Sequence, residues 1–341
     1  MGGRVVRRLG SVLAVLVVLT GALPGFGQGD PRVPVARREG RVVVYGTMPA
    51  DNFEVLAKIY EGRYGVPVEY WRAPPDRLVD RALAEFRAGR ALFDVVIAPS
   101  PVMRILKQQG LFAPYTSPAY EPFPAAARDR DGVLSPPYRL NLYTALYNPR
   151  LVRASEAPRT YADLLDPRWR GRLVLADPTL NLGSAQWLLN LRRVLRAEWR
   201  GFVERLAAQA GGLEESILTI PSKVVAGEYA LGIALLSYVH LFGRQGAPVD
   251  YVRLDPMLAE AHHAAVGTRA PHPQAARLFV DTLMSRAALL ALAQAGEFVL
   301  LPGIYPPIRD ADRLRVTVME DYDEETYRRA REEWAPVFRR R

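Results

Sequence analysis

Small hydroxyl residues and a glycine lie where a predicted strand meets a predicted helix, in the segment 173–189. The apolar run ends at Ala176, and the loop after it holds four polar or small residues, Thr179, Asn181, Gly183 and Ser184. The first N–H groups of a helix are unpaired and carry partial positive charge, so they bind anions. Asparagine and serine are also frequent helix N-caps. The segment therefore predicts either an anion-binding loop or a helix cap.

Three further polar residues follow predicted strands in the first third of the chain: Thr47, Arg72 and Ser100. In open parallel α/β sheets, ligands bind in the crevice beyond the carboxyl ends of the strands. Hydroxyl groups, helix N-termini and an arginine at that edge favour a small anionic solute, because they donate hydrogen bonds and bring positive charge. We therefore expect these residues and the loop at 177–184 to line one cleft.

A catalytic constellation is not recognisable in the sequence. It contains no Walker loop, no H-E-x-x-H and no G-x-S-x-G motif. His262 and His263 are adjacent, so their side chains diverge on a strand or a helix, which disfavours a shared metal ion. His240 is a weak candidate for ligand contact on residue type alone. We expect a binding protein and not an enzyme; the alternative from another class is a secreted enzyme on the same scaffold.

Strands and helices alternate in the first part of the chain. The segment 41–45 is predicted to be a buried strand, and Asp51 is suited to cap the helix that follows it. Further strands are predicted at 66–71 and 93–98, and further helices at 76–87 and 101–109. Near-continuous apolar strands separated by helices are typical of a parallel α/β sheet.

The alternation restarts in the second half, after an extended segment at 140–147. Strands are predicted at 172–176, 213–220 and 230–236, and helices up to about 196, at 199–210 and at 223–227. No low-complexity linker separates the halves, so we expect the chain to pass between two lobes through extended segments. The predicted fold class is α/β, with two lobes that are each a mainly parallel sheet flanked by helices.

Composition and the N-terminus indicate an exported protein. The chain has 341 residues, no cysteine and a formal net charge of +9, so disulfides and thiolate metal sites are excluded. Residues 1–29 combine three arginines with an unbroken apolar stretch at 12–19, which is typical of a secretory signal peptide and short for a membrane span. No nucleic-acid-binding motif occurs, and we expect no nucleic acid partner.

Several stretches resemble those of one known family. Residues 161–171 read YADLLDPRWRG and lead through a strand to ADP at 176–178, similar to the family's T-x-x-D-L-L-D-P-K-W-K-G stretch followed by D-P. GEYALGI at 227–233 and APHPQAARLF at 270–279 resemble two more of its motifs, and GLF at 110–112 and YN at 147–148 also match. Over nearly all of its mature length, the chain resembles periplasmic solute-binding proteins of ABC importers, in the ferric-iron-binding branch of the family 1 extracellular solute-binding proteins.

The resemblance implies a two-lobed periplasmic-binding-protein fold of type II that closes on its ligand like a hinged trap. Lobe 1 would comprise residues 38–138 and about 263–300, and lobe 2 residues 139–262 and about 301–341. It also implies a monomeric periplasmic receptor, without a resident cofactor, that delivers its solute to an ABC permease in the membrane.

The resemblance leaves two classes of ligand open. Iron-binding members commonly use two adjacent tyrosines, a histidine and an acidic residue; here Tyr238 matches the first tyrosine, but Val239 replaces the second. A lone phenol with a pKa near 10 favours Fe(III) less than it favours an organic ligand. We therefore expect an anionic solute that bears a phosphate, phosphonate or carboxylate, with transported Fe(III) as the alternative. In that alternative Tyr238 would be a metal ligand, and Tyr143 or Tyr147 could supply a second phenolate.

The predicted ligand-binding residues are thus Thr47, Arg72, Ser100, Thr179, Asn181, Gly183, Ser184 and Tyr238.

Overall fold

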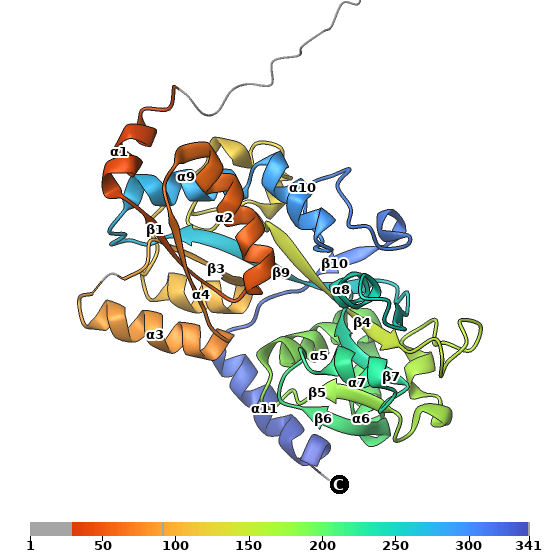
Figure 1. Cartoon of the computed structure of the whole chain (residues 1–341). Helices are drawn as coiled ribbons and strands as arrows, with labels where there is room; N and C mark the ends of the chain where they lie inside the picture. The colour runs from red at the N-terminus through yellow and green to blue at the C-terminus, as the bar shows by residue number, and fades with distance from the viewer. Residues whose placement is uncertain (1–28, 91, 340–341) are drawn as a thin grey trace, which may run out of the picture.

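The computed structural model describes residues 29–90 and 92–339. The predicted signal peptide at 1–29 lies outside the described residues except for Gly29. Among the helices that the structure describes, none is long and apolar enough to span a membrane. The described chain forms two α/β halves connected by long strands, as Figure 1 shows.

Three parallel strands form the sheet of the first half, in the spatial order β2-β1-β3. Strand β3 is buried along its whole length, as its apolar sequence VVIAP predicts. Each strand leads into a helix that returns over the sheet. The elements of this half are α1 (Arg32–Glu39), β1 (Val42–Gly46), α2 (Ala50–Tyr64), β2 (Val68–Arg72), α3 (Pro75–Arg87), β3 (Val95–Pro99) and α4 (Ser100–Gln108), followed by two short 3-10 turns, η1 (Pro118–Tyr120) and η2 (Ala125–Ala127).

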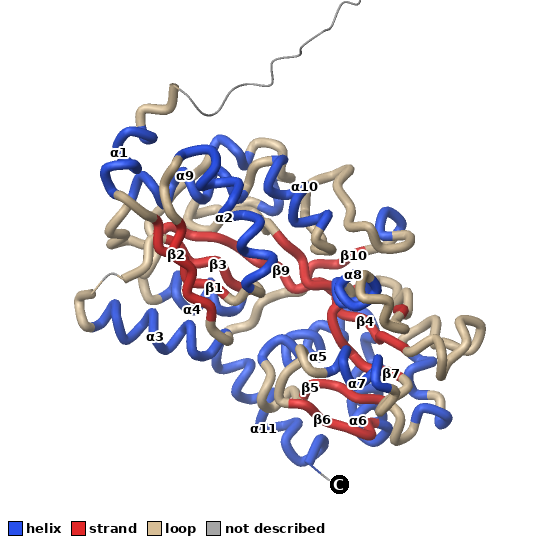
Figure 2. Tube along the Cα trace, viewed as in Figure 1, coloured by secondary structure: helices blue, strands red, loops and turns tan. Residues whose placement is uncertain are grey.

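Two long strands, β4 (Arg139–Tyr147) and β9 (Met257–Val266), connect the halves. Strand β9 pairs antiparallel with β3 through its C-terminal part and with β4 through its middle. Strand β4 in turn pairs with β7 through its C-terminal part. Figure 2 shows both strands running between the two halves. They make the two parallel sheets into one continuous mixed sheet, so the expected extended crossings are present.

The second half repeats the alternation around a smaller sheet in which β7-β5-β6 are parallel neighbours. Its elements are η3 (Ala162–Leu165), η4 (Pro167–Trp169), β5 (Leu173–Ala176), α5 (Leu182–Leu195), η5 (Arg196–Glu198), α6 (Trp199–Gln209), β6 (Ala210–Glu214), α7 (Ile220–Ala226), β7 (Leu231–Leu235), α8 (Ser237–Gly243) and β8 (Asp250–Tyr251). The chain then returns through β9.

Helices of the C-terminal part of the chain pack on both halves. Helices α9 (Pro273–Leu283) and α10 (Arg286–Gln294) pack on the first half, next to α1 and α2. After η6 (Ala311–Arg313) and β10 (Val316–Val318), which pairs with β9, helix α11 (Glu324–Arg339) packs against α5 and α6 of the second half.

Burial separates the core into parts that follow the two halves. Residues of α2, α9 and α10 pack on one face of the first sheet, and residues of α3 and α4 on the other. A third cluster joins the strands of the second half to α5, α6 and α11. The lobe boundaries that we infer from the sequence stay a prediction, and this partition of the apolar side chains supports it.

Several local expectations needed correction. Asp51 does not cap α2, because the helix begins one residue earlier, after Pro49, and Asp51 lies in its first turn. The strand expected at 213–220 is β6, which ends at Glu214, and its apolar tail belongs to a loop and to α7. The sequence reading also did not anticipate β9.

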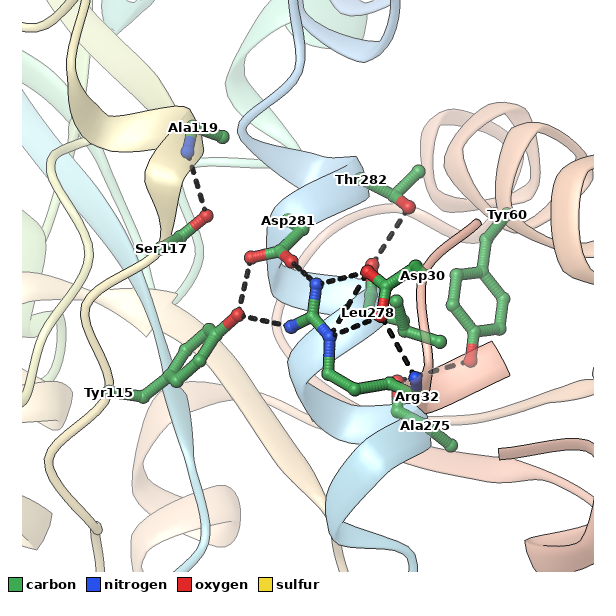
Figure 3. Close-up of polar contacts among 10 residues, drawn as sticks. All are labelled: Asp30, Arg32, Tyr60, Tyr115, Ser117, Ala119, Ala275, Leu278, Asp281 and Thr282. Carbon is green, nitrogen blue, oxygen red and sulfur yellow. Dashed lines mark hydrogen bonds and ion pairs between the residues drawn. The ribbon is translucent and has the colours of Figure 1, made fainter. Parts of the chain in front are cut away.

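A polar cluster holds the first described residues against α9. Figure 3 shows the Arg32 guanidinium between two carboxylates, bonded to Asp30 at 2.6 Å and to Asp281 at 2.7 Å. The Tyr115 hydroxyl accepts from Arg32 and donates to Asp281. Three segments far apart in the sequence are therefore held together at the start of α1.

Candidate functional site

One cavity of about 630 Å³ is lined by both halves and by the two connecting strands. Its volume lies within the range of small-molecule sites, which measure about 300–1,000 Å³. The first half supplies the carboxyl ends of its strands and the helix starts that follow them: Thr47, Pro49, Asp51, Asn52, Arg72, Ala73, Pro74, Pro75, Asp76 and Pro99. This is the edge at which ligands are expected in a parallel sheet.

Three helices begin at this edge after a proline. Pro49, Pro74 and Pro99 are the N-cap residues of α2, α3 and α4, each with an extended ψ of 141° to 154°. A proline side chain accepts no hydrogen bond, and none of the three helices has a side-chain cap. The N–H groups of their first turns therefore bring partial positive charge to this edge, where Asp51 of α2 and Asp76 of α3 also lie.

Arg72 brings a full positive charge to the same edge. It is the last residue of β2 and is exposed, and it forms no salt bridge with any described residue. The neighbouring Thr47 follows β1, and its Oγ1 is buried without a hydrogen-bond partner in the described part of the chain. Both groups line the cavity and have donor capacity that the fold leaves unused.

The opposite wall comes from the second half. Asn181 is the N-cap of α5, and its Oδ1 accepts from the backbone N–H of Ser184 at 2.9 Å. Gly183 lies in the first turn of α5 directly beside the Tyr143 hydroxyl, where a Cβ would overlap that oxygen. Glycine is needed here because of this close approach. The loop 215–218 completes the wall.

The outer part of this wall is apolar. Leu180, Leu218 and Leu241 all line the cavity although each is 45–50% exposed. Large exposed side chains around a concave site mark a surface that buries apolar area when it is occupied or closed. The wall therefore suits an organic solute better than a bare ion.

The floor consists of alternate residues of the connecting strands, since every second side chain of a strand points to the same face. Strand β4 contributes Arg139, Asn141 and Tyr143, and β9 contributes Glu260 and His262. The register pairs Arg139 with His262 and Asn141 with Glu260. The polar groups of the floor thus lie on the two strands that connect the halves.

A buried ion pair anchors one side of the floor. Arg139 donates from Nη1 to Glu297 Oε1 at 2.9 Å, and both side chains are 5% exposed. Asn52 of α2 donates to the same oxygen at 2.6 Å. Glu297 Oε2 and Arg139 Nε have no partner among the described residues.

His262 is neutral and surrounded by polar groups of the floor. Its Nδ1 lies 3.2 Å from Arg139 Nη2. Its Nε2 lies 2.8 Å from the Asn141 side-chain amide and 3.2 Å from Glu260 Oε2. Burial, and then the charge of Arg139, hold the pKa of His262 well below its usual range.

Glu260 and Tyr238 are both shifted by burial. Burial raises the pKa of Glu260 to about 7, although a hydrogen bond from Asn141 and the charge of Arg139 oppose the shift. Tyr238, the second residue of α8, has its pKa raised to about 12, first by burial and then by the charge of Glu297. At neutral pH, Tyr238 is therefore a hydroxyl donor.

Five of the eight predicted binding residues line the cavity, namely Thr47, Arg72, Asn181, Gly183 and Tyr238. Their role in ligand binding stays a prediction.

The expected position of the other three is corrected. Ser100 is buried at the start of α4 with its hydroxyl 2.8 Å from His263 Nε2. Thr179 donates to the Asp177 carboxylate at 2.7 Å. Ser184 is buried, and its N–H is taken by Asn181. In each case an interaction within the protein uses the group that was expected to face the solute.

Sequence reasoning missed the floor and its buried acid: Asn52, Arg139, Asn141, Glu260, His262 and Glu297. A signal was present in the alternation of polar and apolar residues in RLNLY at 139–143 and EAH at 260–262. As expected, His262 and His263 diverge, and only His262 faces the cavity; His240 does not line it. In the described ranges, no group of three or more His, Cys, Asp or Glu residues is arranged to hold a metal ion.

The comparisons with known proteins agree with this architecture. A protein of Haemophilus influenzae with no stated function is 26% identical over 308 residues, which covers 86% of this chain and 87% of that one. The structure of the periplasmic binding protein AfuA from Actinobacillus pleuropneumoniae, with fructose-6-phosphate bound, has a TM-score of 0.74 at 19% identity and covers 89% of this chain and 99% of AfuA. Iron-bound HitA from Pseudomonas aeruginosa has a TM-score of 0.72 at 18% identity and covers 88% and 98%. These structures share the fold.

The family model of the bacterial extracellular solute-binding proteins matches residues 41–296, which include both connecting strands and almost all of the cavity lining. The chain belongs to the bacterial extracellular solute-binding protein family.

Proposed function

We propose that the protein is the exported solute-binding component of an ABC importer. It captures a small organic solute with a phosphate, phosphonate or carboxylate group in the cavity between its halves and delivers it to a membrane permease. The family supports the receptor role, and the resemblance of stretches such as residues 161–171 supports the importer. We infer a monomer that acts in the periplasm without a resident cofactor.

One observation carries the anionic group. Arg72 lines the cavity at the edge where three helices begin without side-chain caps, so a full positive charge and the partial positive charge of helix starts lie at one edge. Such an edge stabilises an oxyanion through charge-assisted hydrogen bonds. The cavity volume and the leucines of the opposite wall favour an organic solute over a bare oxyanion. AfuA, which shares the fold, binds a sugar phosphate.

The test is binding of phosphate esters, phosphonates and carboxylates to protein from which co-purified solute has been removed. We expect at least one class to raise the melting temperature and to bind saturably in calorimetry. Arg72→Leu should weaken that binding at least tenfold, and Arg77→Leu, an exposed arginine outside the cavity lining, should leave it unchanged. Equal affinity of the two variants would refute the role of Arg72. Turnover of the bound compound would instead support the enzyme alternative.

Ferric iron is the second candidate, because Tyr143, Tyr238, Glu260 and His262 line the same cavity. Oxygen and imidazole groups suit Fe(III), and HitA binds iron on this fold. The raised pKa of Tyr238 favours the protonated phenol and so favours the organic solute. Titration with ferric citrate separates the two. A visible phenolate-to-iron band that is lost in Tyr238→Phe would establish iron, and a colourless protein would exclude phenolate ligation.

A further inference from the structure

The floor of the cavity holds a carboxylate with one oxygen unused. Glu260 is buried, and its Oε2 contacts the amide of Asn141 at 3.3 Å and His262 Nε2 at 3.2 Å. Its Oε1 has no hydrogen-bond partner among the described residues and lies on the side of Gly183, which also lines the cavity. A solute in the cavity therefore meets a free carboxylate oxygen.

The groups around Glu260 supply no net positive charge. Within the described part of the chain, Arg139 is the one cation that acts on it, and this arginine is already paired with Glu297. His262 is neutral, for the reason given above. When Glu260 is ionised, the floor carries one negative charge in excess.

The remaining titratable neighbours do not change this balance. Tyr143 and Tyr327 of α11 are phenols whose pKa values burial raises, so they are neutral. Asp321, which precedes α11, is paired with Arg104 of α4 at 3.2 Å. No other element packed against Glu260 brings an unpaired cation within the described part of the chain.

An ionised carboxylate is costly in such a place. Burial without a paired cation disfavours the charged form, which is why the pKa of Glu260 rises to about 7. A cation on the solute would remove this penalty, whereas a hydroxyl group would supply a hydrogen bond but no charge. Tyr143 and Tyr238 line the same cavity, and aromatic side chains attract ammonium groups.

The rim of the cavity has the same excess of acid. Asp51, Asp76 and Glu215 line it, and among the described residues of the lining the only arginines or lysines are Arg72 and Arg139. This cavity is acidic in a chain whose formal net charge is +9. A purely anionic solute would leave most of these carboxylates without a partner.

We propose that the solute carries an ammonium group that binds to Glu260, so that the receptor takes up an amine-bearing organic anion. This inference rests on the proposed function, which accounts for the anionic end of the solute at Arg72. The ammonium site disfavours bare oxyanions and simple sugar phosphates as the ligand, because neither brings a positive charge to the floor.

The test uses phosphate monoesters that differ only at the far end of the chain. The set comprises O-phosphoethanolamine, 2-hydroxyethyl phosphate and propyl phosphate, with ammonium, hydroxyl and methyl ends, and the homologues with two additional methylene groups. Calorimetry at pH 7.5 on solute-free protein should give at least tenfold tighter binding for the ammonium end than for either other end. Binding of the ammonium compounds should release protons, which two buffers of different ionisation enthalpy detect.

Glu260→Gln supplies the decisive comparison, because glutamine keeps the shape and removes the charge. The preference for ammonium should fall below threefold in this variant, with no proton release. Glu156→Gln, an exposed carboxylate outside the cavity lining, is the matched control and should keep the preference.

The outcomes separate this inference from the proposed function. Equal or tighter binding of the hydroxyl or methyl compounds would overturn the ammonium site and leave the anion receptor standing. Binding of simple amines as tightly as the amino phosphates would support the ammonium site and refute the anionic end. If none of the compounds binds, both the ammonium site and the anion receptor are refuted. If Glu260→Gln leaves the preference for ammonium intact, the role of this residue is refuted.

Discussion

Arg139→Met removes one charge from a buried pair and leaves the other behind. The Arg139 and Glu297 side chains are each 5% exposed and are joined at 2.9 Å. Loss of one partner of a buried ion pair costs about 3–5 kcal/mol, because the remaining charge stays desolvated. With about 2–4 °C of melting temperature per kcal/mol in domains of 150–250 residues, the expected drop is about 6–20 °C.

The assay is urea unfolding of solute-free protein, followed by tryptophan fluorescence and checked by thermal melting. The double variant Arg139→Met/Glu297→Met should recover at least half of the loss, since it buries no unpaired charge. Lys58→Met is the control, because its pair with Glu54 is 71% and 61% exposed and is worth at most about 1 kcal/mol.

Two results would refute this reasoning. A cost below about 1 kcal/mol for Arg139→Met would mean that the pair is solvated and does not anchor the floor. A double variant as unstable as the sum of the two single variants would mean that the residues act independently, through lost packing and not through charge.

The remaining predictions concern three other positions. Gly183→Ala should cost about 1–3 kcal/mol in urea unfolding, because its Cβ would overlap the Tyr143 hydroxyl; Gly62→Ala, with nothing within 4 Å, should cost nothing, and equal effects would contradict the close contact. The pKa of Glu260 is raised from 4.5 to about 7 on folding, so the folded state binds the proton of this carboxyl more tightly than the unfolded state does. The protonated carboxyl therefore stabilises the folded protein at low pH, and this stabilisation is lost as pH rises from about 4.5 to 7. The loss in the free energy of unfolding is about 3 kcal/mol at 1.36 kcal/mol per pKa unit, and Glu260→Gln should not show it. If the free energy of unfolding of Glu260→Gln depends on pH as in the unmodified protein, another group causes the dependence. Arg32→Ala should destabilise the protein by about 1–2 kcal/mol through its lost bonds at α9 without altering solute affinity, and a changed affinity would show that the start of α1 is coupled to the cavity.

The sequence by itself determined the fold class and much of one edge of the site. Apolar runs that alternate with helical patterns indicated parallel strands, and polar residues at the ends of such strands meet at one edge in this fold. For that reason Thr47 and Arg72 were predicted in the lining from their position alone. Local pattern also placed a cap or anion loop before α5, and the structure shows that Asn181 caps it.

Hydrogen-bond competition explains why three other residues were misplaced. Ser100, Thr179 and Ser184 have suitable groups at suitable positions, but His263, Asp177 and Asn181 use those groups within the protein. A sequence pattern gives the type of a donor, and tertiary contacts decide whether it is still free.

Only the tertiary structure decided the floor. Arg139 and Glu297 are 158 residues apart in the sequence and meet because β4 and β9 pair between the halves and α10 returns to the first. Period-2 alternation tells which residues of β4 share a face, but not which strand lies beside it or which buried acid comes opposite. The charge of the cavity depends on these long-range pairings, because an arginine that already holds a carboxylate adds no net positive charge for a solute.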